Sequence, residues 1–320
     1  MSCSELLSTR LFPKQRGASG VVLTGLAARC DWVITSDSAA PLVELRRLRC
    51  ETSPGTIFLS LRNPFIALAF FAQQVLPQLR RPFVLISGSE DITLPLQCDL
   101  RWRPFSCAED TWHEQIASHP LLRRWYAENL DWPFAANVRP LPLGVLPPTA
   151  ADGSEVLLNV ATPPPPLAER ELLVLCAHRI RPGPQWQARA RLSERLRNLG
   201  YPWLLVPEQE LPPLAYRELL RRCSFVICAS GGGWDPNPKL WHVLLQGAIP
   251  IVLSSALDPV LAQLPVWIVA NWQEVDWRQP ALAEQRQAIS ARQPSGDGLR
   301  QQLLLDHWWH LITDLLETGC

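Results

Sequence analysis

Short apolar runs alternate with longer helical patterns along most of this chain. In the first half, runs at 32–34, 56–60 and 83–87 have the length and β-favouring composition of buried strands. A strand interrupted by proline is expected at 138–145. Apolar residues at helical spacing predict helices at 39–49, 64–79, 109–117 and 120–130. Alternation of this kind indicates βαβ units and a parallel sheet.

A proline-rich segment, residues 146–168, separates the two halves of the pattern. It contains Pro147, Pro148 and the run 163–166, so we expect a stiff, extended connector between domains. Further strands are expected at 172–176, 203–206, 225–228, 248–253 and 266–269. Further helices are expected at 185–199, 212–222, 238–246 and 298–317. The sequence thus predicts an α/β protein with two Rossmann-like domains, residues 1–150 and 151–320.

Residues 223–253 contain the most specific local signal. The apolar run 225–228 is followed by Gly231, Gly232 and Gly233, which lack a Cβ where the chain leaves the predicted strand. A ligand can approach such a backbone closely. The next helix has Asn237 at the N-cap position, Pro238 at the first helical position and Gly247 at its end.

This strand, loop and helix together predict an anion site. Backbone N–H groups and the helix macrodipole favour negative charge at a helix start. Lys239 lies in the first turn, where a cation is otherwise unfavourable by about 0.3–1 kcal/mol. A bound phosphate would neutralise both the lysine and the helix end; the alternative is a surface loop with a solvated lysine. The segment matches neither the P-loop pattern nor G-x-G-x-x-G.

Residues 224–275 resemble the nucleotide-sugar-binding segment of exostosin-like glycosyltransferases. In that family a strand ends in a Gly-rich loop and an Asp, followed by an Arg, an aromatic-Trp-Glu triplet, a helix and Gly-x-Ile-Pro-Ile-Val. The loop here is one residue longer, Lys239 replaces the Arg, and His242 replaces the Glu that is expected to hold the nucleotide ribose.

The resemblance implies a GT-B architecture, in which two Rossmann-like domains face each other across a cleft. It implies transfer of a sugar from a nucleotide-sugar donor to a glycan or other hydroxyl acceptor, with no cofactor besides the donor. The second half would hold the donor and the first half the acceptor. Donor phosphate would lie on Gly231, Gly232, Gly233 and Lys239, with Asp235 and His242 near the ribose or sugar and Arg179 opposite.

Polar clusters follow several other expected strands, at 35–37, 62–63 and 87–91 in the first half. In the second half, His178, Arg179 and Arg181 follow Cys176 and are able to neutralise a diphosphate, although a solvated basic turn is an equal alternative.

Asp91 is the candidate catalytic base, because inverting sugar transfer needs a group that takes the proton of the acceptor hydroxyl. The alternative is an aspartate that caps its own loop. The segments 83–95, 119–131 and 138–145 weakly resemble the acceptor-side half of bacterial exostosin-like proteins.

Charge and composition narrow the range of partners. Thirty basic and thirty acidic residues cancel, which argues against nucleic acid or an anionic membrane as a partner. The longest apolar stretch, 65–75, is too short to span a bilayer, and no signal peptide is evident.

Nine scattered cysteines without C-x-x-C favour a reducing, cytoplasmic location. No metal site is expected, because D-x-D is absent and the histidines lack ligand spacing.

Two other functions remain open. His242 in place of the family glutamate favours a non-catalytic nucleotide- or glycan-binding protein on a glycosyltransferase scaffold. A nucleotide-dependent oxidoreductase is the third alternative, against which the missing G-x-G-x-x-G counts.

Overall fold

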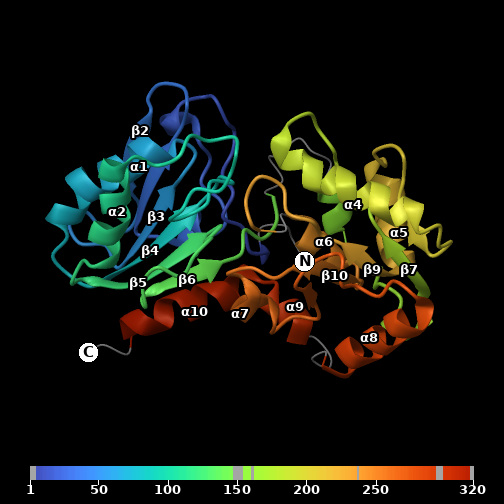
Figure 1. The fold of residues 1–320 in the computed structure, drawn as a ribbon. Coiled ribbons are helices and arrows are strands. Elements are labelled where there is room, and N and C mark those ends of the chain that lie inside the picture. The colour runs from blue at the N-terminus through green and yellow to red at the C-terminus, as the bar shows by residue number, and fades with distance from the viewer. Residues whose placement is uncertain (1–4, 147–153, 160–161, 236–237, 293–297, 318–320) are drawn as a thin grey trace. The chain divides into compact units, whose positions relative to one another are not determined.

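A computed structural model describes residues 5–146, 154–159, 162–235, 238–292 and 298–317 (Figure 1). The chain divides into two compact units. The N-terminal unit comprises residues 2–150, 233–235 and 303–320, and the C-terminal unit comprises residues 151–232 and 236–302. Each unit contains its own sheet, so the α/β class and the two sheets predicted from the sequence are confirmed.

The sheet of the N-terminal unit has six strands in the order β2-β1-β3-β4-β5-β6. Five of them are parallel to their neighbours, and β2 pairs antiparallel with β1. The strands β1, β3 and β4 are buried throughout, as expected for apolar runs covered on both faces. The strands are β1 Trp32–Ser36, β2 Val43–Arg47, β3 Thr56–Ser60, β4 Phe83–Gly88, β5 Leu122–Glu128 and β6 Val138–Leu141.

Three α-helices of this unit accompany the sheet. Helix α1, Pro64–Phe70, continues through a π-helical turn to a 3-10 turn that ends at Gln78. Helix α2, Cys107–Ala117, begins with a capping box, in which the Ser106 N–H donates to the Glu109 carboxylate at 2.8 Å. Helix α10, Leu305–Glu317, lies against β4 and β5 (Figure 1).

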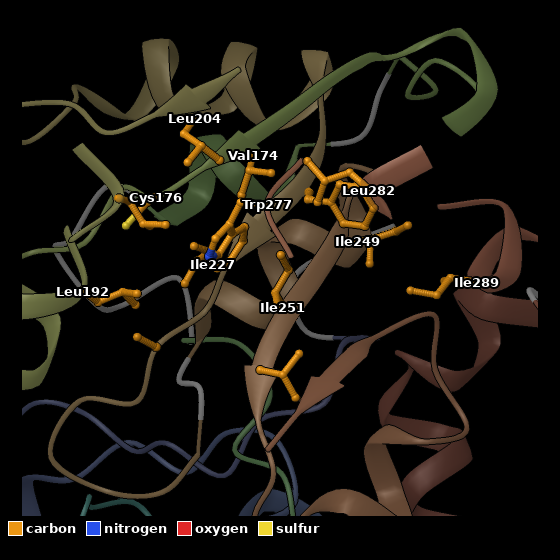
Figure 2. Packing of buried hydrophobic residues seen from close by; sticks show 14 residues of the cluster. Val174, Cys176, Leu192, Leu204, Ile227, Ile249, Ile251, Trp277, Leu282 and Ile289 are labelled. Atoms are coloured by element: carbon orange, nitrogen blue, oxygen red, sulfur yellow. The ribbon is translucent and has the colours of Figure 1, made fainter. Parts of the chain in front are cut away.

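The sheet of the C-terminal unit has five strands, all parallel, in the order β11-β10-β9-β7-β8. Its strands are β7 Glu171–Leu175, β8 Leu204–Leu205, β9 Cys223–Ile227, β10 Ile249–Leu253 and β11 Trp267–Val269. The described helices are α3 Ser154–Leu158, α4 Gln187–Asn198, α5 Pro213–Arg222, α6 Pro238–Leu245, α7 Asp258–Leu261, α8 Gln279–Arg292 and α9 Gly298–Gln302. Side chains from β7, β9 and β10 meet α4, α8 and Trp277 in one hydrophobic core (Figure 2).

The order of these strands creates a topological switch point between β7 and β9. The chain runs outward from β7 to β8, returns past β7 to β9, and then continues the other way to β10 and β11. The connections that leave the carboxyl ends of β7 and β9 therefore diverge. In open α/β sheets, ligands bind at this place.

Several predicted elements are wrong, and in two of them strand pairing overrides the local helical pattern. Residues 39–49 and 120–130 were expected as helices but contain the strands β2 and β5. Paired arginines, at 46–47 and 123–124, hide the alternation of both strands. Helix α3 lies in the segment expected to be an extended connector, and helix α8 was missed.

The single helix expected at 298–317 is divided into α9 and α10. The break is at Leu303, whose carbonyl accepts a hydrogen bond from the Leu7 N–H at 3.1 Å. Residues 303–320 and 233–235 belong to the N-terminal unit, whereas the predicted domain ranges placed them in the second domain. Within the described residues, no helix is both long and apolar enough to cross a lipid bilayer.

The amino-terminal side of the C-terminal sheet is held by Arg170, a buried side chain that precedes β7. Its guanidinium donates to the carbonyls of Pro165, Leu220, Cys223 and Gln246. Leu220 and Gln246 lie in the last turn of α5 and directly after α6, so two helix ends direct their negative dipole ends at this cation.

We predict that Arg170→Met lowers the free energy of unfolding by about 3 kcal/mol or more, because several buried carbonyls lose their donor at once. Urea denaturation of the full chain measures this. Arg222→Met is the matched control, because Arg222 pairs with Glu171 at the exposed surface and its loss should change little. Equal effects of the two substitutions would contradict the role given to Arg170.

Candidate functional site

The switch point brings together two loops that were singled out from the sequence. The loop after β7 carries His178, Arg179 and Arg181, and the loop after β9 carries Gly231 and Gly232. The strands are direct neighbours, with Val174 opposite Phe225. Both loops therefore start from the same edge of the sheet, and Lys239 lies in the first turn of the helix that follows the second loop.

A buried arginine that sequence reasoning missed ties the two loops together. Arg189 donates from Nε to the Ser230 carbonyl and from Nη2 to the Ala229 carbonyl, both at 2.9 Å. Its Nη1 donates to the Arg179 carbonyl at 3.1 Å. One guanidinium on α4 thus fixes the backbone of both loops. The sequence offers only one arginine among several on an amphipathic helix, which is too weak a signal to single it out.

The same guanidinium explains one of the glycines. It lies over the ring of Trp186, 4.8 Å from the ring centroid. A Cβ on Gly231 would lie 3.1 Å from Arg189 Nη2 and 3.6 Å from the Trp186 ring. A side chain at 231 would therefore crowd the Arg189 guanidinium, so packing inside the protein already favours glycine there.

Lys239 reaches back to the loop after β7. Its Nζ donates to the Ala177 carbonyl and lies 3.5 Å from His178 Nδ1. Burial lowers the pKa of Lys239 to about 8, and the positive charge of Arg189 contributes in the same direction. The lysine remains mostly protonated at pH 7, and an incoming anion would stabilise its charge.

His178 is neutral in this cluster. Burial holds the pKa of His178 well below its usual value, and the nearby charges of Lys239 and Arg189 lower it further. Its Nε2 lies 3.1 Å from Cys176 Sγ. Because Lys239 can only donate, Nδ1 is the acceptor and the ring proton resides on Nε2, facing the thiol. His178 therefore orients Lys239 and does not supply the positive charge expected from the sequence.

The two predicted arginines of this loop point outward. Arg179 is exposed and forms an ion pair with Glu210, to which its Nε donates at 2.8 Å. Arg181 is also exposed. The basic character of the site is thus carried by Lys239 and Arg189, whereas the sequence pointed to His178, Arg179 and Arg181.

Gly233 and Asp235 belong to the N-terminal unit, where they pack against the end of β5. The Asp235 N–H donates to Asn129 Oδ1 at 2.9 Å, and its carboxylate accepts from the Leu143 N–H at 3.0 Å. A Cβ on Gly233 would lie 2.2 Å from Asn129 Oδ1, so no other residue fits there. These contacts give Gly233 and Asp235 structural roles that the sequence did not indicate.

His242 lies on α6 three residues after Lys239 and is only 5% exposed. A ribose would have to reach a side chain that the protein already covers. Asn237, the predicted N-cap of the same helix, lies outside the described residues.

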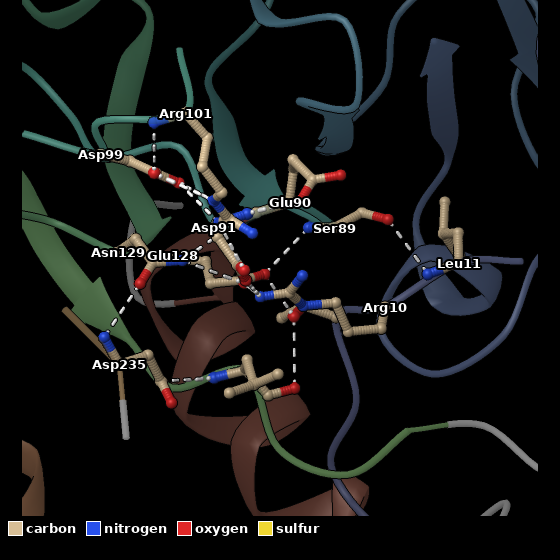
Figure 3. A network of polar contacts seen from close by, with 12 residues as sticks. Arg10, Leu11, Ser89, Glu90, Asp91, Asp99, Arg101, Glu128, Asn129 and Asp235 are labelled. Carbon is tan, nitrogen blue, oxygen red and sulfur yellow. Dashed lines mark hydrogen bonds and ion pairs between the residues drawn. The ribbon is translucent and has the colours of Figure 1, made fainter. Parts of the chain in front are cut away.

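Asp91 stands in an ion-pair network at the carboxyl ends of β4 and β5 (Figure 3). Its carboxylate pairs with Arg10 at 2.6 Å and with Arg101 at 2.7 Å. Burial raises the pKa of Asp91, but the two arginines outweigh this and hold the pKa well below its usual value. A carboxylate stabilised in this way is a weak proton acceptor, which argues against the base role inferred from the sequence.

Glu128, at the end of β5, is the buried centre of the network. It pairs with Arg10 at 2.5 Å and accepts hydrogen bonds from Thr9 Oγ1 at 2.6 Å and from the Ser89 N–H at 2.8 Å. Burial raises the pKa of Glu128, and Arg10 opposes this rise. The network therefore joins the ends of two strands to the segment at residues 9–10 (Figure 3).

Comparisons with known proteins leave the family open. No protein-family model matches the chain, and no curated protein matches it. The resemblance to exostosin-like glycosyltransferases thus rests on the residues quoted above. In the part of the chain that the structure describes, no group of three or more His, Cys, Asp or Glu side chains is arranged to hold a metal ion.

We predict that Asp91→Asn lowers the free energy of unfolding by about 3 kcal/mol at pH 7, because it leaves the buried Arg10 with one ionic partner fewer. The native pKa of Asp91 lies below its unfolded value of about 3.9. Its contribution is therefore complete above that pH and is lost as pH falls through the native pKa.

Urea denaturation of wild type and variant between pH 7 and pH 3 tests this, and the difference between them should shrink at the acid end. Asp276→Asn is the matched control, because Asp276 pairs with Arg278 at the exposed surface. A difference that does not change with pH would contradict an ionised, arginine-bound Asp91.

Proposed function

We propose that the chain is a glycosyltransferase that moves a sugar from a nucleotide-sugar donor to a hydroxyl acceptor, with the donor diphosphate bound at the loops after β7 and β9. The observation that carries the proposal is the meeting of the glycine loop, Lys239 and Arg189 at the switch point of a parallel sheet. The order and spacing of residues 224–275, which resemble the donor-binding segment of exostosin-like proteins, support it.

The diphosphate is the part of the donor that this site suits best. We assign the diphosphate to the backbone N–H groups of Gly231, Gly232 and the first turn of α6, where the helix dipole is positive. Lys239 supplies a point charge with three N–H donors, one of which is given to the Ala177 carbonyl. Arg189 adds positive charge from behind, while its hydrogen bonds to three carbonyls keep the loops in place.

The proposal places the acceptor on the N-terminal unit and catalysis in a cleft of the GT-B kind. If Asp91 is the base, it has to take the acceptor proton while two arginines stabilise its carboxylate. Lowering the pKa of a base by one weakens its binding of a proton by about 1.4 kcal/mol. The roles of Asp235 and His242 at the ribose remain predictions. The Asp235 carboxylate already accepts a hydrogen bond from Leu143, and His242 is buried.

A non-catalytic nucleotide-binding protein is the second candidate. The specific observation that favours it is the pair of arginines on Asp91, which stabilises the only proposed base as an anion. This alternative shares the donor site and differs only in the absence of sugar transfer.

We predict that Lys239→Ala weakens the binding of UDP or GDP by about ten- to a hundredfold, the loss expected when a charge-assisted hydrogen bond of about 1.5–3 kcal/mol is removed. Titration calorimetry measures it, with NADH as a ligand that tests the oxidoreductase alternative. The only other lysine of the chain provides the matched control, Lys14→Ala. Unchanged nucleotide affinity in Lys239→Ala would refute the phosphate site.

The wild-type affinity for a nucleoside diphosphate should also fall as pH rises through about 8, where Lys239 loses its proton before nucleotide is bound. The diphosphate binds the protonated lysine better, so affinity is highest below this pH and declines above it. Titrations at pH 7, 8 and 9 show the decline, and Lys239→Ala should lack it. An equal decline in both proteins would assign it to another group.

Turnover separates the two candidates. A glycosyltransferase slowly hydrolyses its bound nucleotide sugar even without acceptor. If Asp91 is the base, the rate of this hydrolysis, or of sugar transfer, should fall on the order of a hundredfold in Asp91→Asn. Affinity for the donor should stay unchanged in that variant. Tight nucleotide binding with no turnover of UDP- or GDP-sugars would favour the non-catalytic protein.

A further inference from the structure

Arg62 follows β3 in the N-terminal unit and is buried with part of its guanidinium unused. Only 5% of the residue is exposed. Its Nη1 donates to the Pro13 carbonyl at 2.6 Å, and the guanidinium lies over the Phe12 ring, 5.3 Å from the centroid. Among the described residues, neither Nε nor Nη2 has a hydrogen-bond partner.

The two unused nitrogens form one edge of the guanidinium. Nε–H and the adjacent Nη2–H point the same way and are spaced to meet both oxygens of a carboxylate or two oxygens of a phosphate. Buried donors without partners are costly, so proteins seldom keep them unless water or a ligand satisfies them. This edge is therefore shaped for a two-pronged contact that the described residues do not provide.

The carboxylates near Arg62 are engaged elsewhere. Asp37 accepts hydrogen bonds from the N–H groups of Gln15 and Arg16, at 3.0 and 2.9 Å, and from Ser38. Glu90 pairs with Lys14 at 2.6 Å and accepts from its neighbour's N–H. Burial lowers the pKa of Arg62 to about 10, and Glu90 and Asp37 oppose this, so the guanidinium is charged at neutral pH.

The place of Arg62 in the fold suits a ligand site. Asp37, Arg62 and Glu90 follow β1, β3 and β4, which are neighbouring parallel strands, so all three stand at the carboxyl edge of the sheet. The segment 13–16, whose Pro13 contacts Arg62, is exposed. The contacts that tie it down are few: the Lys14–Glu90 ion pair, two hydrogen bonds to Asp37 and the one from Arg62 to Pro13.

We propose that Arg62 is an oxyanion site, which binds the carboxylate or phosphate group of a small ligand through Nε and Nη2 after the segment 13–16 moves aside. Arg62 belongs to the N-terminal unit and Lys239 to the C-terminal unit, and the proposal does not depend on sugar transfer. If sugar transfer occurs, an acidic group on the acceptor is the natural occupant.

Binding of inorganic phosphate and of acetate tests the proposal, each measured by calorimetry at constant ionic strength. The parent protein is Lys239→Ala, so that the proposed donor site does not contribute. At least one of the two anions should bind the parent, and its affinity should fall tenfold or more after Arg62→Lys, which keeps the charge but loses the fork. Arg139→Lys, at an exposed arginine of the same unit, is the matched control and should bind as the parent does.

Preference for phosphate or for acetate tells which oxyanion the ligand carries, and binding of either supports the site. The assigned Nε–H NMR signal of Arg62 in the parent gives a readout that needs no Arg62 variant, and it should shift on addition of the anion. The proposal is overturned if neither anion moves that signal, or if anion affinity survives Arg62→Lys. A normal Arg62 response, together with a wild-type protein that binds neither UDP nor GDP, would refute the donor site alone.

Discussion

The candidate site depends on one buried guanidinium, that of Arg189, which donates to carbonyls of both loops at the switch point. Without it, the carbonyls of Ala229 and Ser230 would need other donors in a place that water reaches poorly. The close approach of this guanidinium favours glycine at 231, and its charge lowers the pKa of Lys239 and of His178. One side chain thereby sets the backbone, the packing and the electrostatics of the loops.

Arginine plays the same part elsewhere in the chain, which contains only two lysines among thirty basic residues. Arg46 donates to the carbonyls of Ala18, Ser19 and Val21, and Arg170 to four carbonyls around the start of β7. A planar group with five donors suits this use, because it satisfies several carbonyls at once. A basic residue near a strand end is therefore often a backbone support and not a ligand contact. Arg62 differs, because one edge of its guanidinium is left unused by the described residues.

The sequence predicted the parts of the fold that local pattern determines. Apolar strands such as β3, β4 and β9 and the start of α6 at Pro238 were placed within a few residues. The strands β2 and β5 were missed, because their arginines obscure the alternation and their state is decided by pairing with β1 and β4. In the candidate site, the sequence singles out the glycines by their missing Cβ atoms and Lys239 because a cation at a helix start is locally unfavourable. Arg189 could not be found, because its role exists only once two distant loops meet.

We propose that a nucleoside diphosphate binds between the loops that follow β7 and β9. Hydrogen exchange with and without saturating UDP or GDP tests it most directly, because bound phosphate protects the N–H groups that it contacts. We expect slower exchange in peptides covering residues 176–186 and 228–245, and unchanged exchange at the amino-terminal side of the same sheet around Arg170. Binding that leaves both loops unprotected, or that protects only residues far from the switch point, would refute the proposed site.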